Sequence, residues 1–139
     1  MSRDVTIFLR SSQRYPQQEP EEMELTVRGK LYFRGGCFFV SYEESAMTGM
    51  EGTRTTLKVE PERVEIIRTG KNHSRLRLQQ GLRCESPYRT PYGLLQLATV
   101  THSLTAQMGE EGGALSIRYQ VELEGQLASE NHLQIEVRP

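Results

Sequence analysis

Residues 51–93 read EGTRTTLKVEPERVEIIRTGKNHSRLRLQQGLRCESPYRTPYG, and this stretch decides the fold. Four runs of strand character are separated by turn residues at positions 61–62, 70–72 and 80–81. Short strands that reverse tightly, one after another, are typical of a β-meander. The stretch therefore predicts four antiparallel strands joined in chain order, with runs of similar character on both sides.

The clearest alternation in the chain lies at residues 22–34. One face of this run carries apolar side chains and a glycine: Met23, Leu25, Val27, Gly29, Leu31 and Phe33. A period of two held over this length predicts one buried face and one face in water. Gly29 lies in the middle of the buried face, where a glycine often marks a bend or a bulge. A long strand bent at a glycine favours a barrel over a flat sandwich.

Further strands are predicted wherever apolar residues alternate with polar ones or fill both faces, at residues 5–10, 37–42, 94–106, 115–124 and 133–137. No stretch of helical length has the helical period, and only a short helix near 43–50 or 19–23 is left open. The pattern predicts an all-β fold in which residues 1–139 form one domain, a single closed antiparallel barrel of about eight to ten strands.

The composition excludes several classes of partner. The formal net charge is −1, so the whole molecule has no strong attraction to nucleic acid or to a membrane. Residues 51–93 nevertheless hold nine of the 17 basic residues and five of the 18 acidic ones. No apolar run approaches the ~20 residues of a transmembrane helix, and the first residues lack a signal-peptide core. We expect a cytoplasmic protein with no membrane contact and with Cys37 and Cys84 as free thiols.

The residue types of common catalytic and metal sites are present, but their spacing in the sequence matches no known catalytic or metal-binding motif. His73, His102 and His132 share no ligand spacing, and the chain has no Gly-x-Ser-x-Gly elbow and no glycine-rich phosphate loop. A pair of inward glutamates would suit hydrolysis, and only Glu43 and Glu51 are candidates for the inward position. We therefore expect no catalytic residue, no metal and no cofactor, and a protein that is not an enzyme.

Several polar side chains share the inward face of their predicted strands. Arg68 falls on the same face as Val64 and Ile66. By the same parity, three tyrosines point inward, Tyr42, Tyr88 and Tyr119. A lone buried charge costs several kcal/mol, so an inward arginine must find a partner. That partner is either another group of the protein at the barrel mouth or the acidic group of a ligand.

Residues 88–93 are predicted to form a rigid connection at one end of the barrel. Pro87 and Pro91 cannot donate to a ladder, so regular pairing is expected to stop there. Gly93 permits the positive φ that would start the next strand. Tyr88 and Tyr92 would then lie near the rim, where their rings either cap the core or gate a ligand.

Five motifs give the chain a resemblance to the YwiB-like family of small, uncharacterised bacterial proteins: Gly52-Thr53-Arg54-Thr55-Thr56-Leu57, Arg68-Thr69-Gly70, Tyr88-Arg89-Thr90-Pro91-Tyr92-Gly93, Leu115-x-Ile117-x-Tyr119 and Asn131-x-Leu133-x-Ile135. The resemblance covers most of the chain and implies a calycin-like barrel, similar in outline to lipocalins and fatty-acid-binding proteins. It implies no activity. The chain lacks the tryptophan of lipocalins, and because Arg118 and Tyr119 are adjacent, they cannot form the Arg-x-Tyr clamp of fatty-acid-binding proteins.

Our functional hypothesis is a barrel that binds a small, partly apolar and acidic ligand, held by Arg68, Tyr42, Tyr88, Tyr92 and Tyr119. One alternative is a structural or protein-interaction barrel filled by its own side chains, which an interior below the ~300 Å³ of typical ligand sites would favour. The other is binding of single-stranded nucleic acid by the basic half of the chain, through Arg75, Arg77, Arg83 and Arg89 beside Tyr88 and Tyr92. The sequence does not indicate an oligomeric state.

Overall fold

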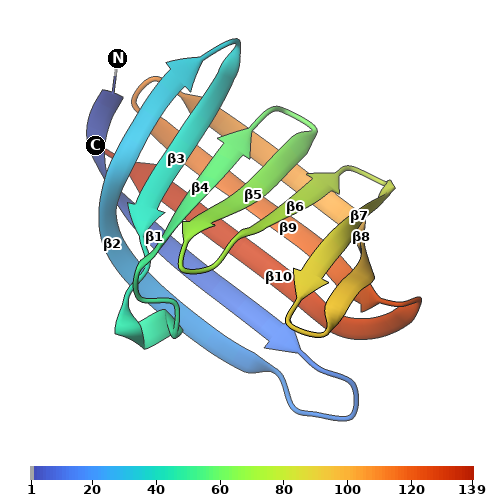
Figure 1. Ribbon diagram of the computed structural model, residues 1–139. Coiled ribbons are helices and arrows are strands. Elements are labelled where there is room, and N and C mark those ends of the chain that lie inside the picture. Colours follow the sequence, from blue (N-terminus) through green and yellow to red (C-terminus); the bar gives the residue numbers. More distant parts are fainter. Residues whose placement is uncertain (1) are drawn as a thin grey trace.

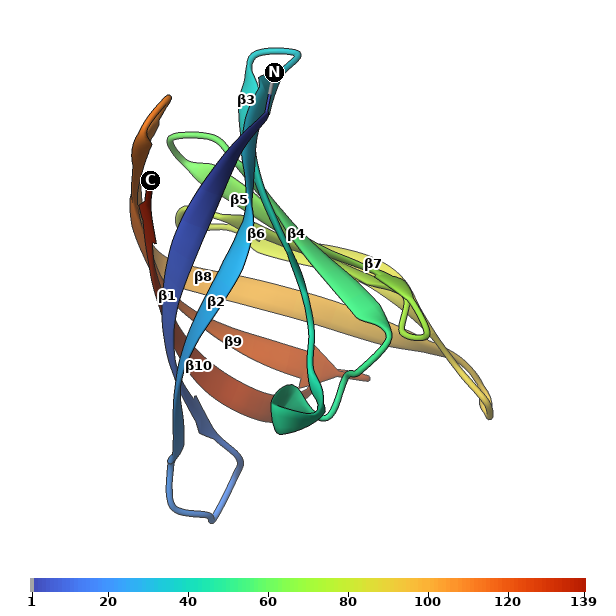
Figure 2. The ribbon, with the colours of Figure 1, turned by 90° about the vertical axis from the view of Figure 1, so that its left-hand side faces the viewer.

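The structure, a computed structural model, describes residues 2–139, which form ten strands and one short 3₁₀ helix (Figure 1). The elements are β1 (Ser2–Arg14), β2 (Glu21–Arg34), β3 (Cys37–Glu43), η1 (Ala46–Thr48), β4 (Thr53–Val59), β5 (Arg63–Gly70), β6 (Ser74–Gln79), β7 (Arg83–Thr90), β8 (Gly93–Gly109), β9 (Gly112–Leu123) and β10 (Gln126–Arg138). All ten strands belong to one antiparallel sheet in the order β6-β5-β4-β3-β2-β1-β10-β9-β8-β7. The sheet curls into a nearly closed barrel (Figure 2), which confirms the predicted all-β barrel of eight to ten strands.

The barrel closes where the turn after β6 meets β8. The amide of Gly81 donates to the carbonyl oxygen of Thr101 (3.1 Å). The amide of Thr101 donates in turn to the carbonyl oxygen of Leu82 (3.2 Å). The Thr99 hydroxyl adds a bond to the carbonyl oxygen of Arg77 (2.5 Å). These bonds satisfy backbone groups that an open sheet edge would leave exposed.

The predicted meander is correct for its first three strands and wrong for the fourth. β4, β5 and β6 pair in chain order. β6 and β7 form no ladder, because they are the two ends of the sheet. Residues 80–82 carry the chain from one edge of the sheet, at β6, to the other edge, at β7, and this connection closes the barrel.

The core fills much of the barrel interior and borders the cavity described below. Its fully buried side chains come from strands all around the sheet, with Val5, Ile7, Val40, Val64, Leu78 and Ile117 each at 0% exposure. Burying a side chain of this size contributes about 1.5–3 kcal/mol relative to leaving it in water. Alternation of inward apolar and outward polar residues therefore supplies the main stabilisation of the fold.

The long strand β2 curves around one side of the barrel, as Figure 1 shows. Leu31 is buried as predicted, whereas Leu25 and Val27 are only half-buried because they lie toward the open end. Phe33 shares their parity but is 54% exposed, which corrects the prediction that it is buried. It lies at the end of the strand, where its ring meets Phe38 edge-on at 4.8 Å between centroids.

The prediction that pairing stops near Pro87 is wrong. β7 continues through this residue and pairs with β8 as far as Thr90 and Gly93. Because β7 is the last strand of the sheet, a proline whose missing N–H faces the outer edge removes no ladder bond. Pro91 and Tyr92 then form the tight turn into β8, and Gly93 has the expected positive φ, +118°.

Other expectations can be compared directly with the structure. The short helix left open near 43–50 is η1. β1 continues to Arg14, beyond the strand predicted at residues 5–10, and residues 15–20 connect it to β2. Both cysteines are free, as predicted. In the part of the chain that the structure describes, no helix is long and apolar enough to cross a membrane.

Candidate functional site

An interior cavity of about 430 Å³ lies beside η1, since Met47 and Thr48 of that helix line it. Much of its wall is apolar and comes from strands on all sides of the barrel, through Leu9, Leu25, Leu57, Ile66, Leu76 and Ile135. Polar side chains line three parts of the wall. One is on β3 to β5 with the segment after β3, and another is on β9 and β10. The third is on β1 and β2, through Ser11, Ser12, Gln13, Glu21 and Glu22. The cavity is therefore amphipathic, with room for a small molecule.

Register brings the polar group on β3 to β5 together. Thr55 of β4 lies directly opposite Tyr42 of β3 on one side and Arg68 of β5 on the other. Directly opposed residues on one face of a sheet have Cβ atoms about 4.5–5.5 Å apart. Tyr42, Thr55 and Arg68 thus form one inward row across three strands, and all three line the cavity.

Arg68 has an unsatisfied donor in this cavity. Its Nε atom is buried and has no hydrogen-bond partner. Among residues 2–139, its guanidinium forms no ion pair. A buried donor without a partner costs about 1–3 kcal/mol, and more when the group is charged. The internal partner that the sequence left open is therefore absent from the described residues.

Glu44 is the acidic residue that the sequence analysis missed. It is 7% exposed, and its carboxylate accepts hydrogen bonds from the hydroxyls of Thr48 (2.9 Å) and Thr55 (2.5 Å). The two glutamates that the sequence favoured are elsewhere. Glu43 pairs with Arg54 on the outer face, and Glu51 is exposed.

The reason for this error is local. Glu44 follows the last residue of β3 and lies outside the predicted strand at 37–42, so the strand prediction did not reach it. Its amide donates to the carbonyl oxygen of Thr53 (2.8 Å), which turns the chain into the short helix η1. Two signals in the sequence mark it. Glu44 lies two residues after the inward Tyr42, and its spacing from Thr48 lets that hydroxyl reach back to the carboxylate.

The two inward tyrosines remain protonated at neutral pH. Burial and the nearby Glu44 carboxylate raise the pKa of Tyr42, although Arg68 opposes this shift. Burial also raises the pKa of Tyr119, again against the effect of Arg68. Both phenols line the cavity as neutral hydroxyl groups that can donate or accept hydrogen bonds.

The structure does not bring Tyr88 or Tyr92 to the cavity. Tyr88 lies on β7 opposite Leu95 and is 38% exposed. Tyr92 lies at the tip of the β7–β8 turn and is 98% exposed. This turn projects away from η1 (Figure 2). Parity placed Tyr88 on a face but could not show that the hairpin extends beyond the cavity.

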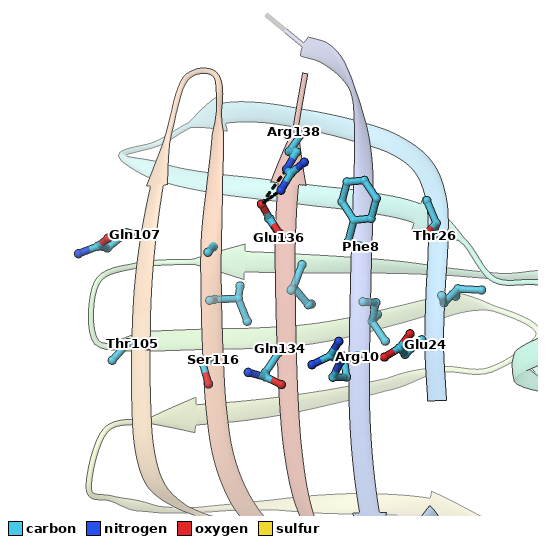
Figure 3. Close-up of a pocket in the computed structure, with 15 residues that line it drawn as sticks. Phe8, Arg10, Glu24, Thr26, Thr105, Gln107, Ser116, Gln134, Glu136 and Arg138 are labelled. Carbon is cyan, nitrogen blue, oxygen red and sulfur yellow. Dashed lines mark hydrogen bonds and ion pairs between the residues drawn. The ribbon is translucent and has the colours of Figure 1, made fainter. Parts of the chain in front are cut away.

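A larger hollow of about 920 Å³ lies on the outer face of β1, β2, β8, β9 and β10 (Figure 3). Its charged groups are already paired, Arg10 with Glu24 at 3.0 Å and Arg138 with Glu136 at 2.5 Å. The Arg138 guanidinium also covers the Phe8 ring, 5.2 Å from its centroid. Since this open surface leaves no buried group unsatisfied, the interior cavity is the stronger candidate site.

The histidines make ordinary polar contacts. His102 Nε2 lies 3.1 Å from Gln120 Oε1, and His132 Nε2 lies 3.1 Å from Ser116 Oγ. His73 is exposed. Over residues 2–139, no group of three or more His, Cys, Asp or Glu side chains is placed to hold a metal ion.

Comparison with known proteins agrees with this architecture. The chain is 29% identical over 99 residues to "Uncharacterized beta-barrel protein YwiB" of Bacillus subtilis (strain 168), covering 71% of this chain and 68% of that protein. The crystal structure of the ywiB protein from Bacillus subtilis superposes with a TM-score of 0.83 at 23% identity, covering 99% of this chain and 92% of that one, and this shows the same fold. The resemblance found in the sequence is confirmed. A match over residues 7–135 shows that the chain belongs to the family described as "Domain of unknown function (DUF1934)".

Proposed function

We propose that this protein binds a small, partly apolar molecule with an acidic group inside its barrel and does not catalyse a reaction. The observation that supports this most is the buried Nε of Arg68, which has no hydrogen-bond partner among residues 2–139. A carboxylate or a similar acid would satisfy that donor with a charge-assisted hydrogen bond.

The surroundings of Arg68 fit the rest of such a ligand. Pockets for small molecules have volumes of about 300–1,000 Å³ and a mostly apolar lining with a few polar groups. The interior cavity, at about 430 Å³, lies in that range. Tyr42 and Tyr119 add hydroxyl groups beside the guanidinium. Likeness in outline to lipocalins and fatty-acid-binding proteins agrees with this proposal but is only an analogy of fold.

The two alternative functions have less support. A barrel filled by its own side chains would leave no cavity of this size. Nucleic-acid binding by the basic half of the chain would need free cations. Two of the four arginines named for it are paired, Arg75 at 3.6 Å from Glu65 and Arg83 at 2.7 Å from Glu122. Surface ion pairs of this kind reduce the positive charge available to a phosphate backbone.

Two fluorescent probes with the same ring system test the proposal. Anilinonaphthalene sulfonate carries an acid, and phenylnaphthylamine does not. Replacing one charge-assisted hydrogen bond should weaken binding about tenfold or more. We expect Arg68→Met to weaken the sulfonate by at least that factor and to leave the neutral probe unchanged. The matched control is Arg77→Met, because Arg77 is exposed on β6.

Equal loss of both probes in Arg68→Met would mean that the variant damages the barrel and that Arg68 does not recognise the acid. Unchanged binding of the sulfonate in Arg68→Met, or the same loss in Arg77→Met, would contradict the proposal directly.

A further inference from the structure

Two opposite charges face the interior cavity without meeting. Arg68 and Glu44 both line it, yet they form no ion pair or hydrogen bond with each other within residues 2–139. Thr55 links the two, since its hydroxyl donates to the Glu44 carboxylate (2.5 Å) and it lies directly opposite Arg68 in the β4–β5 ladder. The cavity wall therefore presents a cation and an anion on either side of Thr55.

Each of these charges can make further hydrogen bonds. The two Glu44 oxygens accept one hydroxyl each, from Thr48 and Thr55. An ionised carboxylate has about four acceptor positions, and the neighbouring Tyr42 hydroxyl can occupy a third, so about one remains for a ligand. The guanidinium of Arg68 has free donors, including its buried Nε.

We infer that the ligand carries a hydrogen-bond donor next to its acidic group, as an apolar α-amino or α-hydroxy acid does. This inference rests on the function proposed above. The acid binds Arg68, and the neighbouring ammonium or hydroxyl group donates to Glu44. The apolar chain lies along Leu57, Ile66 and Leu76.

The arrangement disfavours a simple fatty acid. An acid bound at Arg68 lies near the buried negative charge of Glu44, and like charges in a site of low dielectric repel each other. A donor on the neighbouring carbon replaces that repulsion with an attractive contact. A ligand with an amine alone would instead leave Arg68 unsatisfied.

Octanoate, α-hydroxyoctanoate and α-aminooctanoate share one apolar chain and differ only beside the acid. We expect calorimetry to show that the wild-type protein binds the two substituted acids about tenfold more tightly than octanoate, the usual effect of one added charge-assisted hydrogen bond. Glu44→Gln should abolish that preference. Glu43→Gln is the matched control and should preserve it, since Glu43 pairs with Arg54 on the outer face.

Equal affinities of the wild-type protein for the three acids would overturn this inference and leave the proposed function standing, provided that Arg68→Met weakens them. A preference that survives in Glu44→Gln would also overturn it. If none of the three acids binds and the sulfonate probe is insensitive to Arg68, the proposed function itself fails. The wild-type series decides the question even if Glu44→Gln does not fold.

Discussion

The backbone of Gly29 lies against the carbonyl oxygen of Ser41 so closely that no Cβ fits between them. The Cδ1 atom of Ile7 closes the same space from the other side. This contact allows β2 and β3 to curve together at the middle of the barrel. The glycine in the buried face of β2 is therefore required for close approach, as its position in the sequence suggested.

Gly29→Ala should destabilise the protein, because the new methyl group would push β3 outward. Overpacking of this kind typically costs about 1–3 kcal/mol. The measurement is the free energy of unfolding in urea, with Gly109→Ala as the control, since a Cβ there makes only an ordinary contact with Gly112 (3.8 Å). Equal stability of the two variants would show that the strands do not approach at Gly29 as described.

Leu31→Ala should cost about 2–5 kcal/mol, the usual loss for a buried leucine. Leu31 is 3% exposed and lies in the core. Leu25→Ala should cost less, because Leu25 is half-buried and already borders the cavity. Glu24→Ala should change stability by less than about 0.5 kcal/mol, since its ion pair with Arg10 is exposed. A Leu31→Ala variant with an unchanged denaturation midpoint would contradict the inward assignment of β2.

Gly93→Val should destabilise the β7–β8 hairpin, whereas Tyr92→Phe should be neutral. Gly93 has a φ of +118°, which a β-branched residue adopts only at a cost of about 1–3 kcal/mol. The ring of Tyr92 is 98% exposed, so loss of its hydroxyl removes no buried contact. Thermal unfolding would reveal the difference. A neutral Gly93→Val would mean that this hairpin is formed differently.

Stability should fall as the pH rises above about 10, where the tyrosines of the unfolded chain ionise. Tyr42 and Tyr119 have raised pKa values in the folded protein, so above that pH the unfolded state binds fewer protons than the folded state. The resulting slope is about 1.4 kcal/mol per pH unit for each such group. Tyr42→Phe should make the loss shallower, and Tyr92→Phe should not. Identical slopes for wild type and Tyr42→Phe would contradict burial of the Tyr42 hydroxyl.

The strands of the barrel could be predicted because alternation of apolar and polar residues is a local pattern, visible in the sequence alone. The inward positions of Arg68, Tyr42 and Tyr119 were predicted for the same reason, since each residue lies within a regular strand. Glu44 was missed because it lies one residue beyond the end of β3, although it keeps the inward parity of Tyr42. Thr55 was not predicted as a site residue because an uncharged threonine on an inward face does not stand out from the core residues around it.

The remaining differences depend on which strands lie at the ends of the sheet. A proline breaks pairing in a central strand, but Pro87 is tolerated because β7 is the last strand of the sheet. The sequence could not show that β7 is the last strand. The contact that closes the barrel joins Gly81 to Thr101, which are 20 positions apart in the chain, and no local pattern reports it. The same long-range closure explains why β6 and β7 do not pair.

Native mass spectrometry of the protein purified from its own host tests the central claim most directly. Wild type and Arg68→Met are compared under conditions that preserve non-covalent complexes. We expect the wild-type protein to retain a small molecule that extraction identifies as an acid with an apolar chain, and Arg68→Met to appear mainly at the mass of the chain alone. The same bound molecule in both proteins, or the mass of the chain alone in both, would contradict the claim that Arg68 holds an acidic ligand inside the barrel.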